Sequence, residues 1–145
     1  MKAVTESERS VLMAAMDRIL PGGAEPGATE ANAIAYADWL SRQDEFQSIA
    51  GCCSTSLALL DGLARATYGK SFPACSDEER DALLQGVQAV PHPTVQKFFV
   101  TLIRLTLSGF LCAPHYGGNR GCVGWRHIGF QPHRLTAGSG EMPGG

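Results

Sequence analysis

Apolar residues in this chain recur every three or four positions, and no stretch alternates apolar and polar residues as a half-buried strand would. That spacing places apolar side chains on one face of a helix, so it predicts an all-α fold. The first such stretch begins at Thr5, with Glu8 three positions later, which is the arrangement of a helix capping box. Five stretches have this spacing, at about residues 5–20, 29–42, 46–68, 76–88 and 94–112.

Proline and glycine separate these stretches and dominate the end of the chain. Pro-Gly-Gly follows the first stretch at residues 21–23, and Pro-His-Pro precedes the last at residues 91–93. Both interrupt regular structure. With 145 residues the chain has the size of one domain. We therefore predict a single small helical domain over residues 1–145, with about five helices over residues 5–112 and a long irregular glycine-rich coil over about 113–145.

Charge and hydropathy exclude two classes of partner. The net charge is −2 and the basic residues are scattered, so the sequence lacks the basic patch that nucleic acid requires. The most apolar run, residues 98–113, is shorter than the ~20 residues of a membrane span and contains Arg104. We expect a buried helix there and no direct membrane insertion.

The sequence has no motif for catalysis or for metal binding. It contains neither a Cys-x-x-Cys pair nor two histidines at helical spacing, and no nucleophile motif surrounds a cysteine. The glycine-rich residues 116–121 lack the lysine and hydroxyl residue of a P-loop. We therefore assign no catalytic, cofactor-binding or metal-binding residue to this chain. The alternative is an independent small binding protein or enzyme that uses His and Cys residues of the C-terminal coil.

Two of the five cysteines, Cys112 and Cys122, flank a short glycine-rich loop. A disulfide between them would close that loop, and it would stabilise the fold by roughly 2–3 kcal/mol in the chain-entropy model. Two buried thiols are the other interpretation, since cysteine is among the most buried residue types. The residues alone leave both open.

Two separated stretches resemble the gluconate 2-dehydrogenase subunit 3 family, the small or gamma subunits of flavin-dependent sugar and sugar-acid dehydrogenases. The first is MDRILPGGAEPGATEANAIAYADWL, residues 16–40, and the second is SGFLCAPHYGGNRGCVGWRHIGFQP, residues 108–132. The second is the more specific of the two. It departs from the expected family pattern at Ala113, where an acidic residue is expected.

The resemblance implies a subunit without a cofactor or an active site of its own. Its partner would be a large FAD-binding catalytic subunit of the glucose-methanol-choline (GMC) type, which this chain would help to fold, to stay stable and to be exported. A multihaem cytochrome c subunit commonly completes such complexes, so haem c or an iron–sulfur cluster would lie elsewhere in the complex. The implied location is the periplasm or its face. The sequence shows no twin-arginine signal, which leaves open both a signal that has been removed and a complex that stays in the cytoplasm.

The partner interface is expected in the C-terminal coil. A glycine-rich segment can follow the contour of a partner, while aromatic rings and guanidinium groups anchor it. Trp125 is the expected central anchor, and its replacement by alanine should weaken association with the flavoprotein. The predicted interface residues are Pro114, Tyr116, Gly117, Gly118, Asn119, Arg120, Gly124, Trp125, Arg126 and Phe130.

Overall fold

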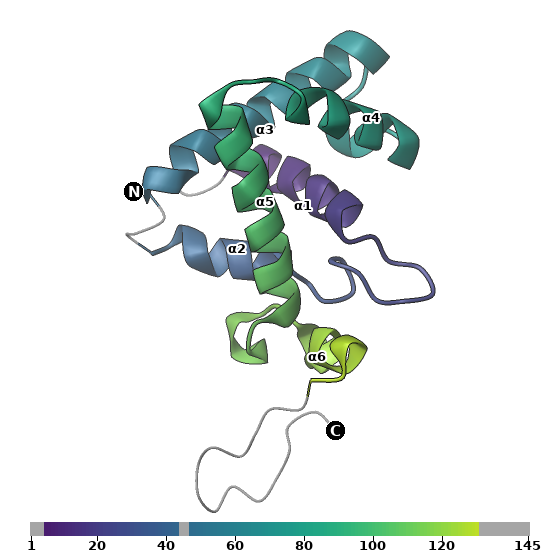
Figure 1. The fold of residues 1–145 in the computed structure, drawn as a ribbon, viewed down its shortest axis with the longest axis vertical. Coiled ribbons are helices and arrows are strands. Elements are labelled where there is room, and N and C mark those ends of the chain that lie inside the picture. The colour runs from purple at the N-terminus through teal and green to yellow at the C-terminus, as the bar shows by residue number, and fades with distance from the viewer. Residues whose placement is uncertain (1–4, 44–46, 131–145) are drawn as a thin grey trace, which may run out of the picture.

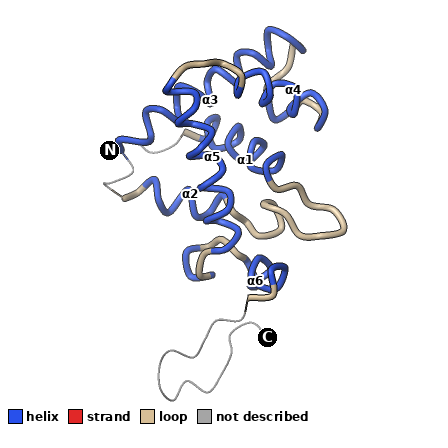
Figure 2. Tube along the Cα trace, viewed as in Figure 1, coloured by secondary structure: helices blue, strands red, loops and turns tan. Residues whose placement is uncertain are grey.

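Helices and the turns between them account for the fold in the computed structural model, which describes residues 5–43 and 47–130 (Figures 1 and 2). No strand occurs among these residues, so the prediction of an all-α domain is confirmed. The α-helices are α1 (Glu6–Ile19), α2 (Ile34–Ser41), α3 (Gln47–Tyr68), α4 (Asp77–Gln88), α5 (Pro93–Leu111) and α6 (Val123–Ile128). Short 3₁₀ helices lie at Phe72–Ala74 (η2), Pro114–Tyr116 (η3) and Arg120–Cys122 (η4).

Local sequence signals explain where α1, α4 and α5 begin. Both capping boxes form: the Thr5 hydroxyl accepts from the Glu8 amide at 3.1 Å, and Ser76 and Glu79 repeat the arrangement at α4. Pro93 begins α5, where a missing N–H costs nothing. Helix α2 begins later than the spacing predicts, at Ile34, because residues 28–33 form turns with Asn32 in a left-handed conformation at φ 55°.

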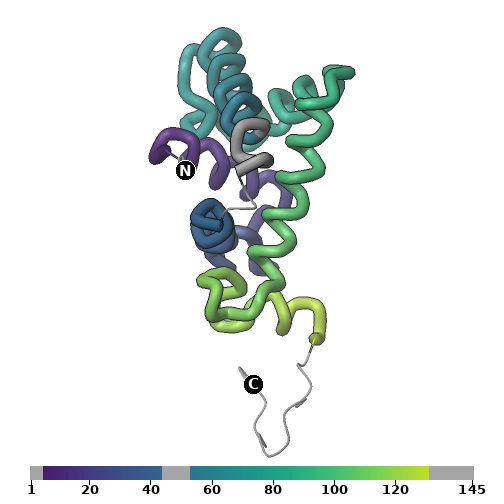
Figure 3. The backbone as a smooth tube through the Cα atoms, turned by 90° about the vertical axis from the view of Figure 1, so that its left-hand side faces the viewer, coloured from purple at the N-terminus to yellow at the C-terminus, as the bar shows by residue number. Residues whose placement is uncertain are grey.

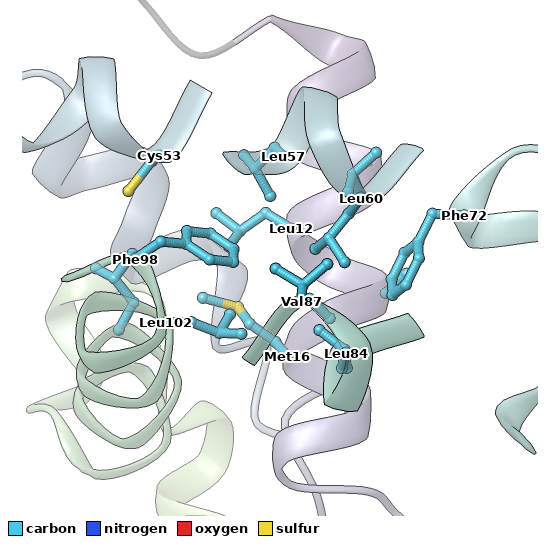
Figure 4. Packing of buried hydrophobic residues seen from close by; sticks show 14 of the residues in the cluster. Leu12, Met16, Cys53, Leu57, Leu60, Phe72, Leu84, Val87, Phe98 and Leu102 are labelled. Carbon is cyan, nitrogen blue, oxygen red and sulfur yellow. The ribbon is translucent and has the colours of Figure 1, made fainter. Parts of the chain in front are cut away.

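The hydrophobic core lies where α1 is enclosed by α3, α4 and α5. Figure 4 shows large side chains from these four helices meeting around Met16, which is 1% exposed. Phe72 of η2 closes one side of the core, and Phe98 of α5 closes the other. Burial of rings and branched side chains of this kind contributes roughly 1.5–3 kcal/mol each.

Ion pairs join α1 to two of its neighbours. Arg9 donates to both carboxylate oxygens of Asp38 in α2, and Arg18 donates to both oxygens of Asp81 in α4 at 2.8 and 3.0 Å. Hydrogen bonding to the Arg18 guanidinium lowers the pKa of Asp81 below its usual value, and the Asp81 hydrogen bond in turn raises the pKa of Arg18. These paired hydrogen bonds link α2 and α4 to α1.

Helix α5 runs along the long axis of the molecule, from the region of α3 and α4 to α6 (Figures 1 and 3). Over the parts of the chain that are described, no helix combines the length and the apolar character needed to cross a bilayer. Helix α5 thus links the core formed with α3 and α4 to the segment around α6. That segment contains the candidate functional site.

Candidate functional site

The glycine-rich segment after α5 is folded back into compact turns where the sequence predicts a coil. Residues 114–128 form η3, η4 and α6 in close succession. Residues with positive φ separate these short helices, and two of these residues, Asn119 and Cys122, are not glycine. The positive angles are at Gly117 (98°), Asn119 (47°), Gly121 (61°), Cys122 (60°) and Gly129 (73°). Residues 131–145 of the predicted coil lie outside the described residues.

Asn119 is the centre of this segment and has no exposed surface. Its side-chain Nδ2 donates to the Cys112 carbonyl at 2.8 Å, and its Oδ1 accepts from the Gly124 amide at 2.8 Å and the Trp125 amide at 3.3 Å. Its own amide donates to the Gly109 carbonyl at 2.7 Å. One buried side chain thus satisfies a carbonyl just beyond α5 and amides in the first turn of α6.

Three glycines, one near the end of α5 and two in the segment after it, are required because the backbones are in close contact there. A Cβ on Gly109 would lie 2.4 Å from the Ala33 carbonyl oxygen, and one on Gly118 would lie 2.2 Å from the Gly109 oxygen. A Cβ on Gly124 would lie 1.9 Å from the Phe110 oxygen. These distances are far below any carbon–oxygen contact, so alanine does not fit at these positions without movement of the backbone.

The two stretches that resemble the family are in contact in the folded chain. The Arg120 amide donates to the Ala31 carbonyl at 3.0 Å, and Asn32 Nδ2 donates to the Gly117 carbonyl at 3.2 Å. His127 lies 3.2 Å from a carboxylate oxygen of Glu25. We call the contact between residues 27–35, 109–112 and 117–124 the junction.

An aromatic groove lies beside the junction, between α2 and the end of α5. Trp39 and Tyr116 stack edge-on with ring centroids 4.7 Å apart, and Tyr36 lies 6.0 Å from Tyr116. The groove has a volume of about 440 Å³ and is open to solvent. Its lining residues are Tyr36, Trp39, Leu107, Ser108, Leu111, Cys112, Ala113 and Tyr116.

The outer face of α5 continues this groove as an apolar stripe. Val100 is 51% exposed, Ile103 41% and Leu107 44%, and Leu107 also lines the groove. The sequence predicts a buried helix for the whole apolar run and does not indicate this exposed surface. The available signal was that α5 has more apolar residues than one buried face needs, since Val100, Ile103 and Leu107 come in addition to the residues that face the core.

The predicted interface residues fall into three groups in the structure. Three of them serve internal packing and present no surface: Gly118, Asn119 and Gly124. Pro114, Tyr116, Gly117 and Trp125 are half-buried, and Arg120, Arg126 and Phe130 are exposed. The Trp125 ring Nε1 donates to the Leu111 carbonyl at 2.7 Å, and Arg126 donates to the Gly121 carbonyl. Much of the motif therefore holds this chain together, and the partner contact of its exposed residues stays a prediction.

Cys112 and Cys122 are not joined by a disulfide. Cys112 Sγ lies 3.7 Å from the Gly109 carbonyl oxygen, and burial raises the pKa of its thiol, which keeps the sulfur protonated. Cys122 is buried. Among the described residues, no three His, Cys, Asp or Glu side chains lie close enough together to hold a metal ion.

Comparison with known proteins gives one match. No curated protein and no solved structure has significant similarity to this chain. The profile of the gluconate 2-dehydrogenase subunit 3 family matches residues 6–132, which span both stretches of the junction and every described helix. The chain therefore belongs to the gluconate 2-dehydrogenase subunit 3 family, the accessory subunits of a dehydrogenase complex.

Proposed function

We propose that this chain is the non-catalytic small subunit of an FAD-dependent dehydrogenase that oxidises a sugar, sugar alcohol or sugar acid. Its role is to bind the large GMC-type catalytic subunit and to keep that subunit folded and soluble. The observation that carries the proposal is the apolar surface that α5 leaves exposed in a member of this family: Val100, Ile103 and Leu107 next to the aromatic groove.

An exposed stripe of this kind favours a partner for physical reasons. Single exposed apolar residues are common, but a continuous apolar patch beside a groove lined with Trp and Tyr is typical of protein–protein contact. Three large aliphatic side chains on successive turns of one helix would be covered together by one partner element. Covering them stabilises the complex by roughly 25 cal/mol for each Å² of apolar surface removed from water.

The redox chemistry is assigned to other chains in this proposal. FAD would be bound by the catalytic subunit, and haem c or an iron–sulfur cluster, where present, by other parts of the complex. Electrons would pass from the sugar to FAD and then to a multihaem cytochrome c. The location we propose is the periplasm or its face, with this chain accompanying the folded flavoprotein during export.

Co-expression tests the proposal. The GMC-type flavoprotein from the same genome is produced with and without this chain, and this chain, which carries the purification tag, is also produced alone. Soluble flavoprotein is measured by yield and flavin absorbance. We expect the flavoprotein to co-purify in a fixed ratio and to be mostly insoluble when this chain is omitted. The proposal fails if the flavoprotein is equally soluble and active alone, or if the isolated chain contains flavin, haem or metal and oxidises a sugar.

A further inference from the structure

Charged residues lie beside the apolar stripe of α5 on one flank only, and both are basic. Lys97 and Arg104 are both exposed, and their spacing of seven positions, about two helical turns, places them on the same flank of the helix, next to Val100. Helix α5, Pro93–Leu111, contains no acidic residue. Neither cation has an ion pair among the described residues.

The neighbouring helix does not supply the missing negative charge. Asp38 is the one acidic residue of α2, Ile34–Ser41, and Arg9 binds both of its carboxylate oxygens at 2.9–3.1 Å. The groove that α2 and α5 share is lined by aromatic, aliphatic and small side chains without a carboxylate. The surface as a whole is thus apolar with a positive flank.

This charge pattern distinguishes between two occupants. A second copy of the chain would have to pair the surface with itself about a two-fold axis, because symmetric dimers use the same patch on both subunits. That pairing would place Lys97 and Arg104 against α5 and the groove of the other copy, neither of which contains a carboxylate to balance them. Like charges at an interface oppose association, whereas a surface with carboxylates on the facing flank would attract it.

We infer that the outer face of α5 and the aromatic groove form the docking surface for the catalytic subunit, and that the matching surface of that subunit is an apolar ridge flanked by carboxylates. The ridge covers Val100, Ile103 and Leu107, one apolar side chain enters the groove beside Trp39, and the carboxylates face Arg104. The inference rests on the proposed function. It shares only Tyr116 with the interface predicted from the sequence, which lies in the C-terminal segment.

The test compares two surfaces in the purified complex of this chain with its flavoprotein. Arg104→Glu reverses an exposed charge on α5, and Arg120→Glu makes the same change at an exposed position of the predicted C-terminal interface. We expect Arg104→Glu to weaken binding roughly tenfold or more, through repulsion of the facing carboxylates. We expect the affinity of the Arg104→Glu variant to depend less steeply on salt than that of the wild type, and Arg120→Glu to change the affinity less than twofold.

A second pair of variants tests the apolar part. Leu107→Ser should weaken binding at least tenfold, whereas Leu63→Ser, at a 37% exposed position of α3, should leave it unchanged. Circular dichroism and the melting temperature of each free variant show whether it folds.

The outcomes separate this inference from the proposed function. If no complex forms with the wild-type chain, the proposed function fails. If the wild-type complex forms and the α5 variants bind normally, the inference is overturned and the proposed function stands. A free chain that dimerises, and loses its dimer with Leu107→Ser, overturns the inference in favour of a second copy as the occupant.

Discussion

The two ends of α5 are packed in different ways. At the end near α3 and α4, large apolar side chains such as Met16 and Phe98 fill the space between helices (Figure 4). At the junction, backbones meet directly through Gly109, Gly118 and Gly124, and the buried side chain at the centre is the amide of Asn119. A side-chain core accepts substitutions of similar volume, whereas contact between backbones leaves no room for any side chain.

The difference bears on how the proposed docking surface is held. The aromatic groove is formed by α2, the end of α5 and Tyr116, and the junction connects all three. Residues of the junction that do not contact a partner can therefore determine the shape of the groove that we propose contacts it. The junction lies within the two stretches that resemble the family, which is explained if the family motif specifies that shape.

Gly124→Ala is expected to have the largest effect. The new Cβ would lie 1.9 Å from the Phe110 carbonyl oxygen, so α6 must move away from α5. We expect a loss of about 3 kcal/mol in the free energy of unfolding, measured by urea denaturation. Gly62→Ala in α3 is the matched control: a Cβ there meets nothing within 4 Å, so it should stabilise the protein by about 0.5–1 kcal/mol. Equal effects of the two substitutions would contradict the contrast between the two ends.

Asn119→Ala is expected to have the next largest effect. It removes the partners of the Cys112 carbonyl and of the Gly124 and Trp125 amides, and it places alanine at a positive φ. We expect a cost of about 2–3 kcal/mol, since buried polar groups left without partners lose their hydration.

Ser56→Ala is the control for that experiment in the side-chain core. The Ser56 hydroxyl is buried and makes no hydrogen bond to any part of the chain that the structure describes, so its removal should change the free energy of unfolding by less than about 0.5 kcal/mol. A cost at Ser56 as large as that at Asn119 would show that burial, and not hydrogen bonding, sets the effect. Thermal melting of both variants gives the comparison.

The side-chain core was more accessible to prediction from sequence than the junction. Apolar spacing and the capping pairs Thr5–Glu8 and Ser76–Glu79 specify helices locally, and the structure has them. The role of Asn119 depends on residues 109, 112, 124 and 125 reaching it after folding, which no local pattern reveals. The exposed stripe on α5 was missed for a related reason: hydrophobicity predicts burial but does not say whether this chain or another provides it.

The smallest expected effect is a pH dependence confined to the side-chain end, where Arg18 of α1 holds Asp81 of α4. Because the Arg18 hydrogen bond lowers the pKa of Asp81 in the folded state, the unfolded state takes up this proton first as the pH falls. The stabilisation is therefore present above the ordinary aspartate pKa of 3.8 and is lost as the pH falls through the lowered value. Asp81 is 41% exposed, so solvent screening limits the effect to a few tenths of a kcal/mol.

Asp81→Asn tests this linkage against Glu78→Gln, which removes an exposed carboxylate from the same helix. The free energy of unfolding is measured from pH 6 to pH 3 for both variants and the wild type. Asp81→Asn should lower stability at pH 6 and converge with the wild type at the acid end, because protonation removes the same charge from Asp81. Glu78→Gln shows how much of the change at a given pH follows from the loss of a carboxylate from α4 as such, since the Arg18 hydrogen bonds go to Asp81. A constant difference between Asp81→Asn and the wild type across this range would show that the pair stabilises the fold through packing and not through its charge.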